Sequence, residues 1–337
     1  MQNITYKIIE YKNAKYEGGT LDDKKEGKGK IVYGNGDKFD GNFINDKKEG
    51  RGIYYYSNGA KYEGEYKSDK KEGRGIFYYL NGDRYEGEFK NDLREGKGIL
   101  LYKNGTKYEG DFLNDKIEGN GKIYYTNGTI FEGEFNNGIK NGKAIYHYKN
   151  GDRYEGIMNN NKKEGKWIYY FANDDKFEEE YNGDNKNNNK IFYYNNGDKF
   201  EGIWNNGKKE KGKYYYKKIN GENHDIYEGE WINDKKEGKG KYNYVNGDIY
   251  EGNWKEGKKI GKGIYNYKNK DKYDGEWADG KKEGKGIYSF SNGNKYDGNW
   301  KDDERDGEGI IYFANGEQKI CLYSNSVFKK YIEPNKE

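Results

Sequence analysis

Residues able to do chemistry are few in this 337-residue chain, and their spacing gives them no common site. The two histidines, His147 and His224, lie far apart, and neither has Cys or His neighbours at metal-ligand spacing. The single cysteine, Cys321, cannot form an internal disulfide, which fits a reducing compartment. We therefore expect no metal, no cofactor and no catalytic residue, and we predict that the chain is not an enzyme.

Lysine-rich and acidic runs are the remaining candidates for chemistry. Runs such as GKKEGKG at 280–286 superficially resemble phosphate-binding loops, but they lack the G-x-x-x-x-G-K-[ST] spacing and its hydroxyl residue. An acidic residue also recurs after an aromatic one, as at Glu63 and Glu86. A carboxylate column repeated this often is typical of a solvated ladder, not of a tuned acid–base pair. Both features are therefore interpreted as parts of a repeated fold.

The elements that carry these runs are copies of one 23-residue repeat. The clearest copy is 62–84, YEGEYKSDKKEGRGIFYYLNGDR, and about thirteen copies can be aligned over residues 16–318. We number the positions of a copy from its first aromatic residue, which is position 0. Position 1 is Glu or Asp, position 2 is Gly except at Glu179, and position 4 is aromatic except at Thr20 and Met158.

Alternation within a copy predicts two short strands. Tyr62, Gly64 and Tyr66 fall on one face of the first strand, and a second alternating run covers 75–79. We expect the polar segment SDKKEG to turn the chain between the two strands. The Asn-Gly pair at 81–82 is expected to form a tight hairpin turn to the next copy, because both residues tolerate positive φ.

Repetition of these hairpins predicts an all-β fold. The expected architecture is an elongated, single-layer antiparallel β-meander in which each copy contacts mainly its neighbours. Glycines inside strands, such as Gly64 and Gly75, leave room for an aromatic ring. We expect an N-terminal capping strand in 1–15, the repeat array in 16–318, and a C-terminal cap and tail in 319–337.

Irregularity concentrates in the centre of the array, at 154–226. The copy 177–199 has lost three glycines, and the copy 200–226 contains a four-residue insertion. Two interpretations stay open: a bend or change of twist in the array, and neutral decay of a redundant copy.

Charge and hydropathy exclude other classes of function. The 62 basic and 59 acidic residues give a net charge of +3, which is too even a balance to predict a nucleic-acid partner. The N-terminal residues have no apolar signal region, and no apolar run approaches the ~20 residues of a membrane span. We expect a cytoplasmic protein.

The order of the motifs resembles the MORN repeat. Y-E-G-E-[FYW] is followed by G-x-G, an aromatic residue and N-G, and the resemblance covers 16–318. It implies a twisted sheet with an aromatic-lined groove, and a scaffolding or membrane-associated role. Repeat-only members that this chain resembles include radial-spoke and other cytoskeletal scaffolds. We therefore expect a structural, protein-interaction scaffold of a ciliary, axonemal or other cytoskeletal assembly.

The resemblance also implies alternatives. One is a peripheral membrane module that binds phosphoinositides, and another is a regulatory subunit of a separate enzyme. The expected partners are other proteins of a larger assembly, or a second copy of the chain, with a membrane surface as the weaker possibility.

The aromatic face is the first candidate binding surface. No second layer covers a single-layer sheet, so part of this face is expected to be exposed. Position 4 is always Trp after the irregular centre, and Trp is enriched at interaction hot spots. The predicted partner-binding groove consists of Trp204, Trp231, Trp254, Trp277, Trp300, Tyr227, Tyr250, Tyr273 and Tyr296.

A row of paired lysines is the second candidate surface. We expect these pairs to line one long edge of the sheet, where they would either engage anionic lipid headgroups or remain merely solvated. A glutamate follows most pairs, which favours the solvated edge. The pairs chosen for this basic edge are Lys235, Lys236, Lys258, Lys259, Lys281 and Lys282.

Overall fold

The computed structural model describes residues 3–183, 185–217 and 224–332. These residues form strands, turns and bends without any helix, so the described part of the chain contains no helix able to cross a membrane. The chain divides into two compact units, each of which is described by itself. Unit 1 comprises Met1–Ala172 with Tyr181–Asn185, and unit 2 comprises Asn173–Glu180 with Lys186–Glu337.

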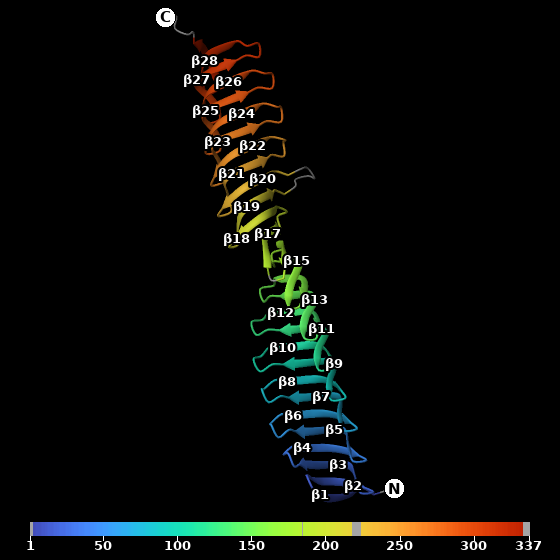
Figure 1. The fold of residues 1–337 in the computed structure, drawn as a ribbon. Helices are drawn as coiled ribbons and strands as arrows, with labels where there is room; N and C mark the ends of the chain where they lie inside the picture. The colour runs from blue at the N-terminus through green and yellow to red at the C-terminus, as the bar shows by residue number, and fades with distance from the viewer. Residues whose placement is uncertain (1–2, 184, 218–223, 333–337) are drawn as a thin grey trace. The chain divides into compact units, whose positions relative to one another are not determined.

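The strands of unit 1 follow one another in chain order (Figure 1). Their bounds are β1 (Thr5–Tyr11), β2 (Ala14–Leu21), β3 (Lys24–Tyr33), β4 (Lys38–Ile44), β5 (Lys47–Tyr55), β6 (Lys61–Lys67), β7 (Lys70–Tyr78), β8 (Arg84–Lys90), β9 (Leu93–Leu101), β10 (Lys107–Leu113), β11 (Lys116–Tyr124), β12 (Ile130–Asn136), β13 (Ile139–His147), β14 (Arg153–Asn159) and β15 (Lys162–Tyr170).

The remaining strands also follow one another in chain order. Two of them, β16 (Lys176–Asn182) and β17 (Asn185–Tyr193), contain residues of both units. Those of unit 2 are β18 (Lys199–Asn205), β19 (Lys208–Tyr215), β20 (Ile226–Ile232), β21 (Lys235–Asn243), β22 (Ile249–Lys255), β23 (Lys258–Asn266), β24 (Lys272–Ala278), β25 (Lys281–Ser289), β26 (Lys295–Lys301), β27 (Glu304–Tyr312), β28 (Gln318–Ser324) and β29 (Val327–Ile332).

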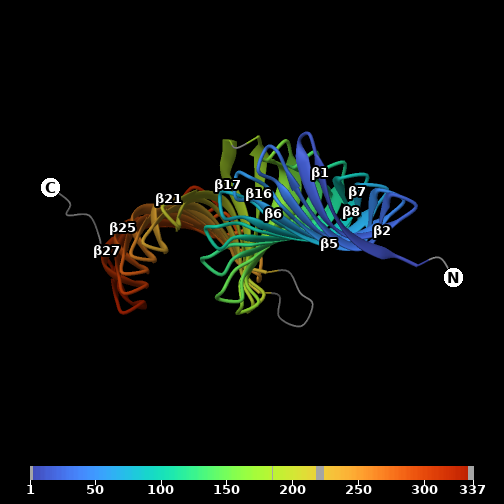
Figure 2. The same cartoon turned by 90° about the horizontal axis from the view of Figure 1, so that it is seen from below.

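From β1 to β15, and again from β17 to β29, each strand pairs antiparallel with its neighbour in sequence. In the hairpin β6–β7, Tyr62 lies opposite Phe77 and Gly64 lies opposite Gly75, and the register shifts by a β-bulge between Gly64 and Tyr66. The same shift recurs from copy to copy, so equivalent positions of successive copies stack in rows. In Figure 2 the strands of unit 1 overlie one another in this way. The predicted all-β meander of stacked hairpins is confirmed.

The turn inside each copy is shorter than the sequence pattern predicts. In the copy 62–84 it consists of Ser68 and Asp69, with φ of 49° and 74°, and the next strand already begins at Lys70. Positive φ at both central residues is the requirement of a type I′ turn, which matches the twist of the flanking strands. The expectation that the whole segment SDKKEG forms the loop is wrong, because the lysines and Glu72 belong to β7.

The Asn-Gly pair makes a different turn from the expected one. Only Gly82 has a positive φ, of 91°, and its N–H donates to the carbonyl of Tyr79 at 3.0 Å. The N–H of Tyr79 donates to the carbonyl of Asp83 at 2.9 Å and closes a three-residue loop. Asn81 acts through its side chain, whose Oδ1 accepts the N–H of Asp83 at 3.0 Å.

The ends of the described chain are strands. β1 pairs with β2 from Thr5 to Tyr11, and the segment 320–323 lies in β28, which pairs with β27 and carries the buried Cys321. A further strand, β29, follows it. Residues 1–2 and 333–337 of the predicted cap and tail lie outside the described residues, as do residues 218–223 of the insertion.

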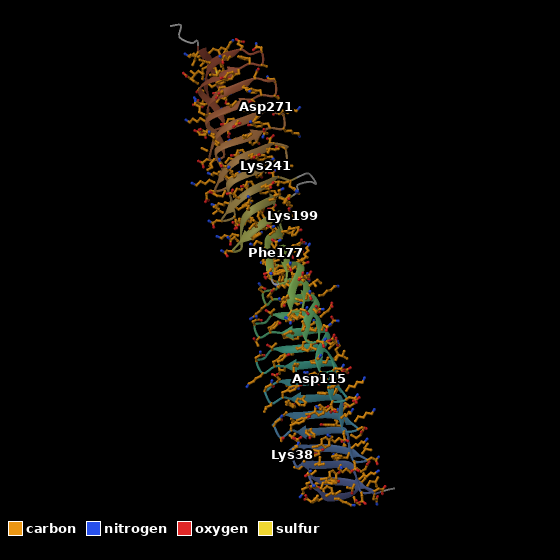
Figure 3. All side chains as sticks on the ribbon, viewed as in Figure 1. Lys38, Asp115, Phe177, Lys199, Lys241 and Asp271 are labelled. Carbon is orange, nitrogen blue, oxygen red and sulfur yellow. The ribbon has the colours of Figure 1, made fainter. Side chains whose placement is uncertain are left out.

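The divergent copy 177–199 keeps its two strands despite its lost glycines. Glu179 and Lys190 occupy the positions that two facing glycines hold in other copies, and Glu179 is 5 % exposed. The carboxylate of Glu179 lies 3.2 Å from Nζ of Lys190 and 2.8 Å from Nζ of Lys186. An ion pair thus replaces a packing contact. Phe177, which begins this copy, is labelled in Figure 3.

Candidate interaction surfaces

The position 0 rings lie flat over pairs of glycines. The ring of Tyr62 covers Gly64 and Gly75, where an added Cβ would overlap it. Its hydroxyl reaches past them and donates to the carbonyl of Glu65 at 3.1 Å. Tyr62 is 0 % exposed. The strand glycines are therefore packing sites, as the sequence predicts, and the ring that fills them belongs to the same hairpin.

The position 4 rings lock neighbouring copies together. Tyr250 meets Trp254 of its own copy at a centroid distance of 5.2 Å and Trp277 of the next copy at 5.1 Å, and both contacts are edge-to-face. The indole N–H of Trp277 donates to the carbonyl of Gly263 at 3.1 Å. Edge-to-face pairs add about 0.5–1.5 kcal/mol each beyond the area they bury. Inter-copy packing is thus built from the aromatic ladder itself.

The predicted partner-binding groove is therefore not an exposed strip. Trp254 and Trp277 are only 5 % and 4 % exposed, because each ring is covered by the tyrosine of the preceding copy and by a lysine side chain. The expectation of exposure is wrong for this set. Tyr227, Tyr250, Tyr273, Tyr296, Trp231, Trp254, Trp277 and Trp300 are buried, while Trp204 is half-buried.

The second lysine of each pair covers the rings. Nζ of Lys236 lies 4.3 Å from the centre of the Tyr242 ring, and Nζ of Lys259 lies 4.2 Å from that of Trp277. Burial lowers the pKa of Lys236 and of Lys259 to about 8. Lys282 lies over Trp300 in the same way, at 5.1 Å, and burial lowers its pKa too.

The first lysine of each pair points to solvent and is paired with an acid of the next turn. Lys235 pairs with Glu256, Lys258 with Asp279 at 2.9 Å, and Lys281 with Asp302 at 2.9 Å. The predicted row of six edge lysines is therefore wrong, because the two members of each pair lie on opposite faces of the strand. Lys236, Lys259 and Lys282 are half-buried over the aromatic rings, and the exposed three are paired with acids.

A carboxylate staple joins the outer loops of successive copies. Asp271, labelled in Figure 3, accepts the hydroxyl of Tyr288 at 2.8 Å and the N–H of Ser291 at 2.7 Å. The same arrangement holds Asp37, where the N–H of Ser57 and then other donors keep the pKa of the carboxyl below its ordinary value. The Asp–Tyr pairs are 37–54, 152–169, 198–214, 225–242, 248–265 and 271–288.

A groove lies on the opposite face of the sheet in unit 1. It has a volume of about 1220 Å³ and is lined by residues from Asp40 to Ile145. Strand alternation places positions 1 and 3 on this face, on either side of the glycine at position 2. The glycine backbones therefore form the floor, and the flanking side chains form two walls.

One wall of the groove alternates isoleucine with glutamate. Successive strands place Ile53 opposite Glu63, Glu63 opposite Ile76, and Ile76 opposite Glu86. The row continues through Ile99 and Glu109. Sequence reasoning treated the acidic position as a solvated ladder and missed this row. The available signal was the isoleucine that recurs at position 14, directly across from the acid.

The second wall is mixed in charge. Arg51 lies opposite Glu65, and Arg74 lies opposite Glu88. Over the whole groove, eight carboxylates face five Arg and Lys side chains, so the lining is acidic on balance.

Neither histidine lines the groove, although His147 lies beside its lining residue Glu132. Nε2 of His147 lies 3.7 Å from the carboxylate of Glu132, and the ring of His224 meets that of Tyr215 at 5.8 Å. Across residues 3–183, 185–217 and 224–332, no three His, Cys, Asp or Glu side chains gather as metal ligands would.

Comparison with solved structures finds proteins with low similarity to this chain. The SAS-4 (dCPAP) TCP domain of Drosophila melanogaster, in complex with a proline-rich motif of Ana2 (dSTIL), shares 19 % identity over 46 % of this chain and 85 % of that one, with a TM-score of 0.32. The TCP10 domain of Danio rerio CPAP shares 10 % identity over 70 % and 99 %, with a TM-score of 0.27. Neither likeness is close enough to support a functional conclusion.

A search of curated protein sequences found no match. The family model of the MORN repeat matches twelve segments: 16–38, 39–61, 62–84, 85–107, 108–130, 131–153, 154–176, 200–218, 227–249, 250–272, 273–295 and 296–318. The family model does not match the divergent copy 177–199, which contains the Glu179–Lys190 ion pair, although it matches the other twelve aligned copies. With these matches covering most of its length, the chain belongs to the MORN-repeat family.

Proposed function

We propose that the protein is a non-enzymatic scaffold whose repeat array binds other proteins. One observation carries this proposal. Most of the aromatic residues and glycines that recur from copy to copy are used in contacts within and between copies, as in the Tyr250–Trp277 ring pair and the covering of Gly64 and Gly75 by Tyr62. The repeated pattern thus builds a surface on which the remaining side chains stand at fixed intervals. Such arrays serve as extended binding surfaces.

The more specific proposal is a place in a ciliary or other cytoskeletal assembly. It rests on the resemblance to repeat-only MORN scaffolds of the radial-spoke kind. The alternative of a phosphoinositide-binding module is less favoured. One lysine of each pair, such as Lys259, is half-buried over rings, and the other, such as Lys258, is paired with an acid that reduces the local positive charge.

Affinity purification of the tagged full chain from native cells, after mild cross-linking, tests the proposal. The expected result is a reproducible set of structural proteins in near-equal amounts, with cross-links to lysines on the solvent side of the array. A tag-only purification is the control. Recovery of the chain alone, or of membrane vesicles released by high salt, would overturn the scaffold proposal.

A further inference from the structure

The groove of unit 1, on the face opposite the aromatic rings, cannot take a ligand as an added strand. Its floor is formed by strands such as β6, β7 and β8, each of which pairs with a neighbour on both sides. The backbone groups that strand addition would need are therefore already used. A ligand in this groove must be held by side chains, namely the row of isoleucines and glutamates.

The glutamates of that row keep capacity for a second partner. Glu63, Glu86 and Glu109 pair with Lys61, Arg84 and Lys107, which stand two residues earlier on the same strand. Their side chains are 48 %, 53 % and 48 % exposed. Exposed pairs of this kind contribute little stability, so an incoming cation can share the carboxylate at small cost.

The spacing of the glutamates along the row indicates which backbone conformation of a peptide ligand could contact all of them. Each copy adds two strands, so equivalent glutamates of successive copies lie ~9.6 Å apart. A polyproline II helix advances ~9.3 Å in three residues, and it exposes the same face with that period. An α-helix advances ~10.5 Å per seven residues, and over the two intervals from Glu63 to Glu109 its mismatch grows to ~2 Å, against ~0.6 Å for polyproline II.

We propose that this groove binds an extended, proline-rich segment of a partner protein that carries a basic residue at every third position. The basic residues meet Glu63, Glu86 and Glu109, and the residues between them lie on Ile76 and Ile99. The excess of carboxylates in the lining supplies the charge complementarity. The inference rests on the proposed scaffold function and names one class of partner for it.

Binding of labelled synthetic peptides to the full chain, followed by fluorescence anisotropy, tests the proposal. The probe is a (Pro-Pro-Lys) repeat, and the matched control is a peptide of the same composition with its lysines clustered at one end. We expect the periodic peptide to bind at least tenfold more tightly. Equal affinity of the two isomers, tighter binding of a lysine-bearing amphipathic helix, or no binding of the periodic peptide would overturn the proposal.

Variants locate the site. The triple change Glu63→Gln, Glu86→Gln and Glu109→Gln is expected to weaken the periodic peptide at least tenfold. The control change in unit 2, Glu256→Gln with Asp279→Asn and Asp302→Asn, removes the same charge from exposed turn residues outside the isoleucine–acid row and should leave affinity within twofold. Equal losses from both variants would contradict the proposed site.

A charge-reversal variant tests whether the loss of peptide binding is due to misfolding. With Glu63→Lys, Glu86→Lys and Glu109→Lys, the chain should prefer a (Pro-Pro-Glu) repeat to the lysine peptide, and a damaged fold cannot produce that gain. Absence of the switch with strand content intact would count against the groove. If the glutamine variant still recovers every native partner, the groove inference fails while the scaffold function stands. If the wild-type chain recovers none, the scaffold function itself fails.

Discussion

The ammonium nitrogen of Lys259 lies 4.2 Å from the centre of the Trp277 ring, which belongs to the following copy. The same lysine lies 5.0 Å from Tyr265 and 5.2 Å from Tyr250 of its own copy. One cation thus bridges the rings of two copies and covers the open side of the aromatic ladder. Partly buried cation–π contacts are worth roughly 0.5–2 kcal/mol, but burial of the charge opposes this gain.

Because the lysine charge is partly buried over the rings, we predict that the stability of unit 2 rises between about pH 8 and pH 10. Lys236 and Lys259 lose their protons near pH 8 in the folded unit, but only near their ordinary pKa of 10.5 in the unfolded chain. The unfolded state therefore binds more protons over this window, and the free energy of unfolding increases with pH. Urea unfolding followed by tryptophan fluorescence measures the effect.

The double change Lys236→Met and Lys259→Met should reduce this dependence, leaving the part due to Lys282, whereas Lys235→Met with Lys258→Met should leave it unchanged. Above pH 10 the slope should reverse, because burial raises the pKa of tyrosines such as Tyr244 to about 12 and the unfolded chain then loses protons first. A flat profile from pH 8 to 10 in the wild type would contradict the prediction.

The glycine beneath each ring gives a second prediction. Gly75→Ala should destabilise unit 1 by about 1–3 kcal/mol, because the new methyl group overlaps the ring of Tyr62. Adding Tyr62→Phe should recover part of the loss, since the copy 131–153 combines Phe131 with a buried Ala144. Hydrogen exchange of β6 and β7 measures both effects. Equal exchange in the single and double variants would show that the hydroxyl is not the obstacle.

The pairing of β6 with β7 could be predicted because its causes are local. Alternation of Tyr62, Gly64 and Tyr66 sets one face of the strand, and a glycine inside a strand calls for a ring above it. The turn was harder to predict. The two-residue turn at Ser68 and Asp69 has no glycine, so the sequence points to Gly73 instead, which in fact lies in β7.

Coverage of the rings could not be predicted from one copy alone. Trp277 is hidden by Tyr250 of the preceding copy and by Lys259, and both contacts depend on the register between copies. The bulge between Gly252 and Asn253 sets Lys259 opposite Trp254, on the ring side. A shift by one residue would reverse the faces of Lys258 and Lys259. The basic edge was mispredicted for this reason.

The carboxylate staple gives a third prediction. Burial acts to raise the pKa of Asp271, but the N–H of Ser291 and the hydroxyl of Tyr288 outweigh it and hold the pKa below its ordinary value. Stability from this group is therefore present above about pH 4 and is lost as the pH falls further. Tyr288→Phe should cost about 1.5–3 kcal/mol at neutral pH and weaken the acid dependence.

The matched control for that change is Asp83→Asn. The position that faces Asp83 from the next copy is Leu100, which has no hydroxyl, and an Asn there can still accept the N–H of Lys103. Asp83→Asn should therefore cost less than Tyr288→Phe when both are measured by thermal unfolding at pH 7 and in acid. A larger loss from Asp83→Asn would contradict the stabilising role assigned to the tyrosine hydroxyl.

The divergent copy gives the last prediction. Glu179 and Lys190 fill positions where other copies have facing glycines, and their side chains lie 3.2 Å apart with Glu179 buried. Breaking a buried ion pair from one side leaves an uncompensated charge, at a cost of about 3–5 kcal/mol. Glu179→Gln should therefore increase hydrogen exchange in β16 and β17, whereas the exposed Glu180→Gln should not.

Replacing both partners by glycine should be far less harmful than removing one. Glu179→Gly with Lys190→Gly restores the pattern of the other copies, and Phe177 can then cover the two glycines as Phe39 covers Gly41 and Gly52. That result would show that the Glu179–Lys190 ion pair occupies a former glycine packing site but is not required for stability. If the double variant exchanges as fast as Glu179→Gln alone, the ion pair has a role that glycine packing cannot supply, and the copy is more than a decayed repeat.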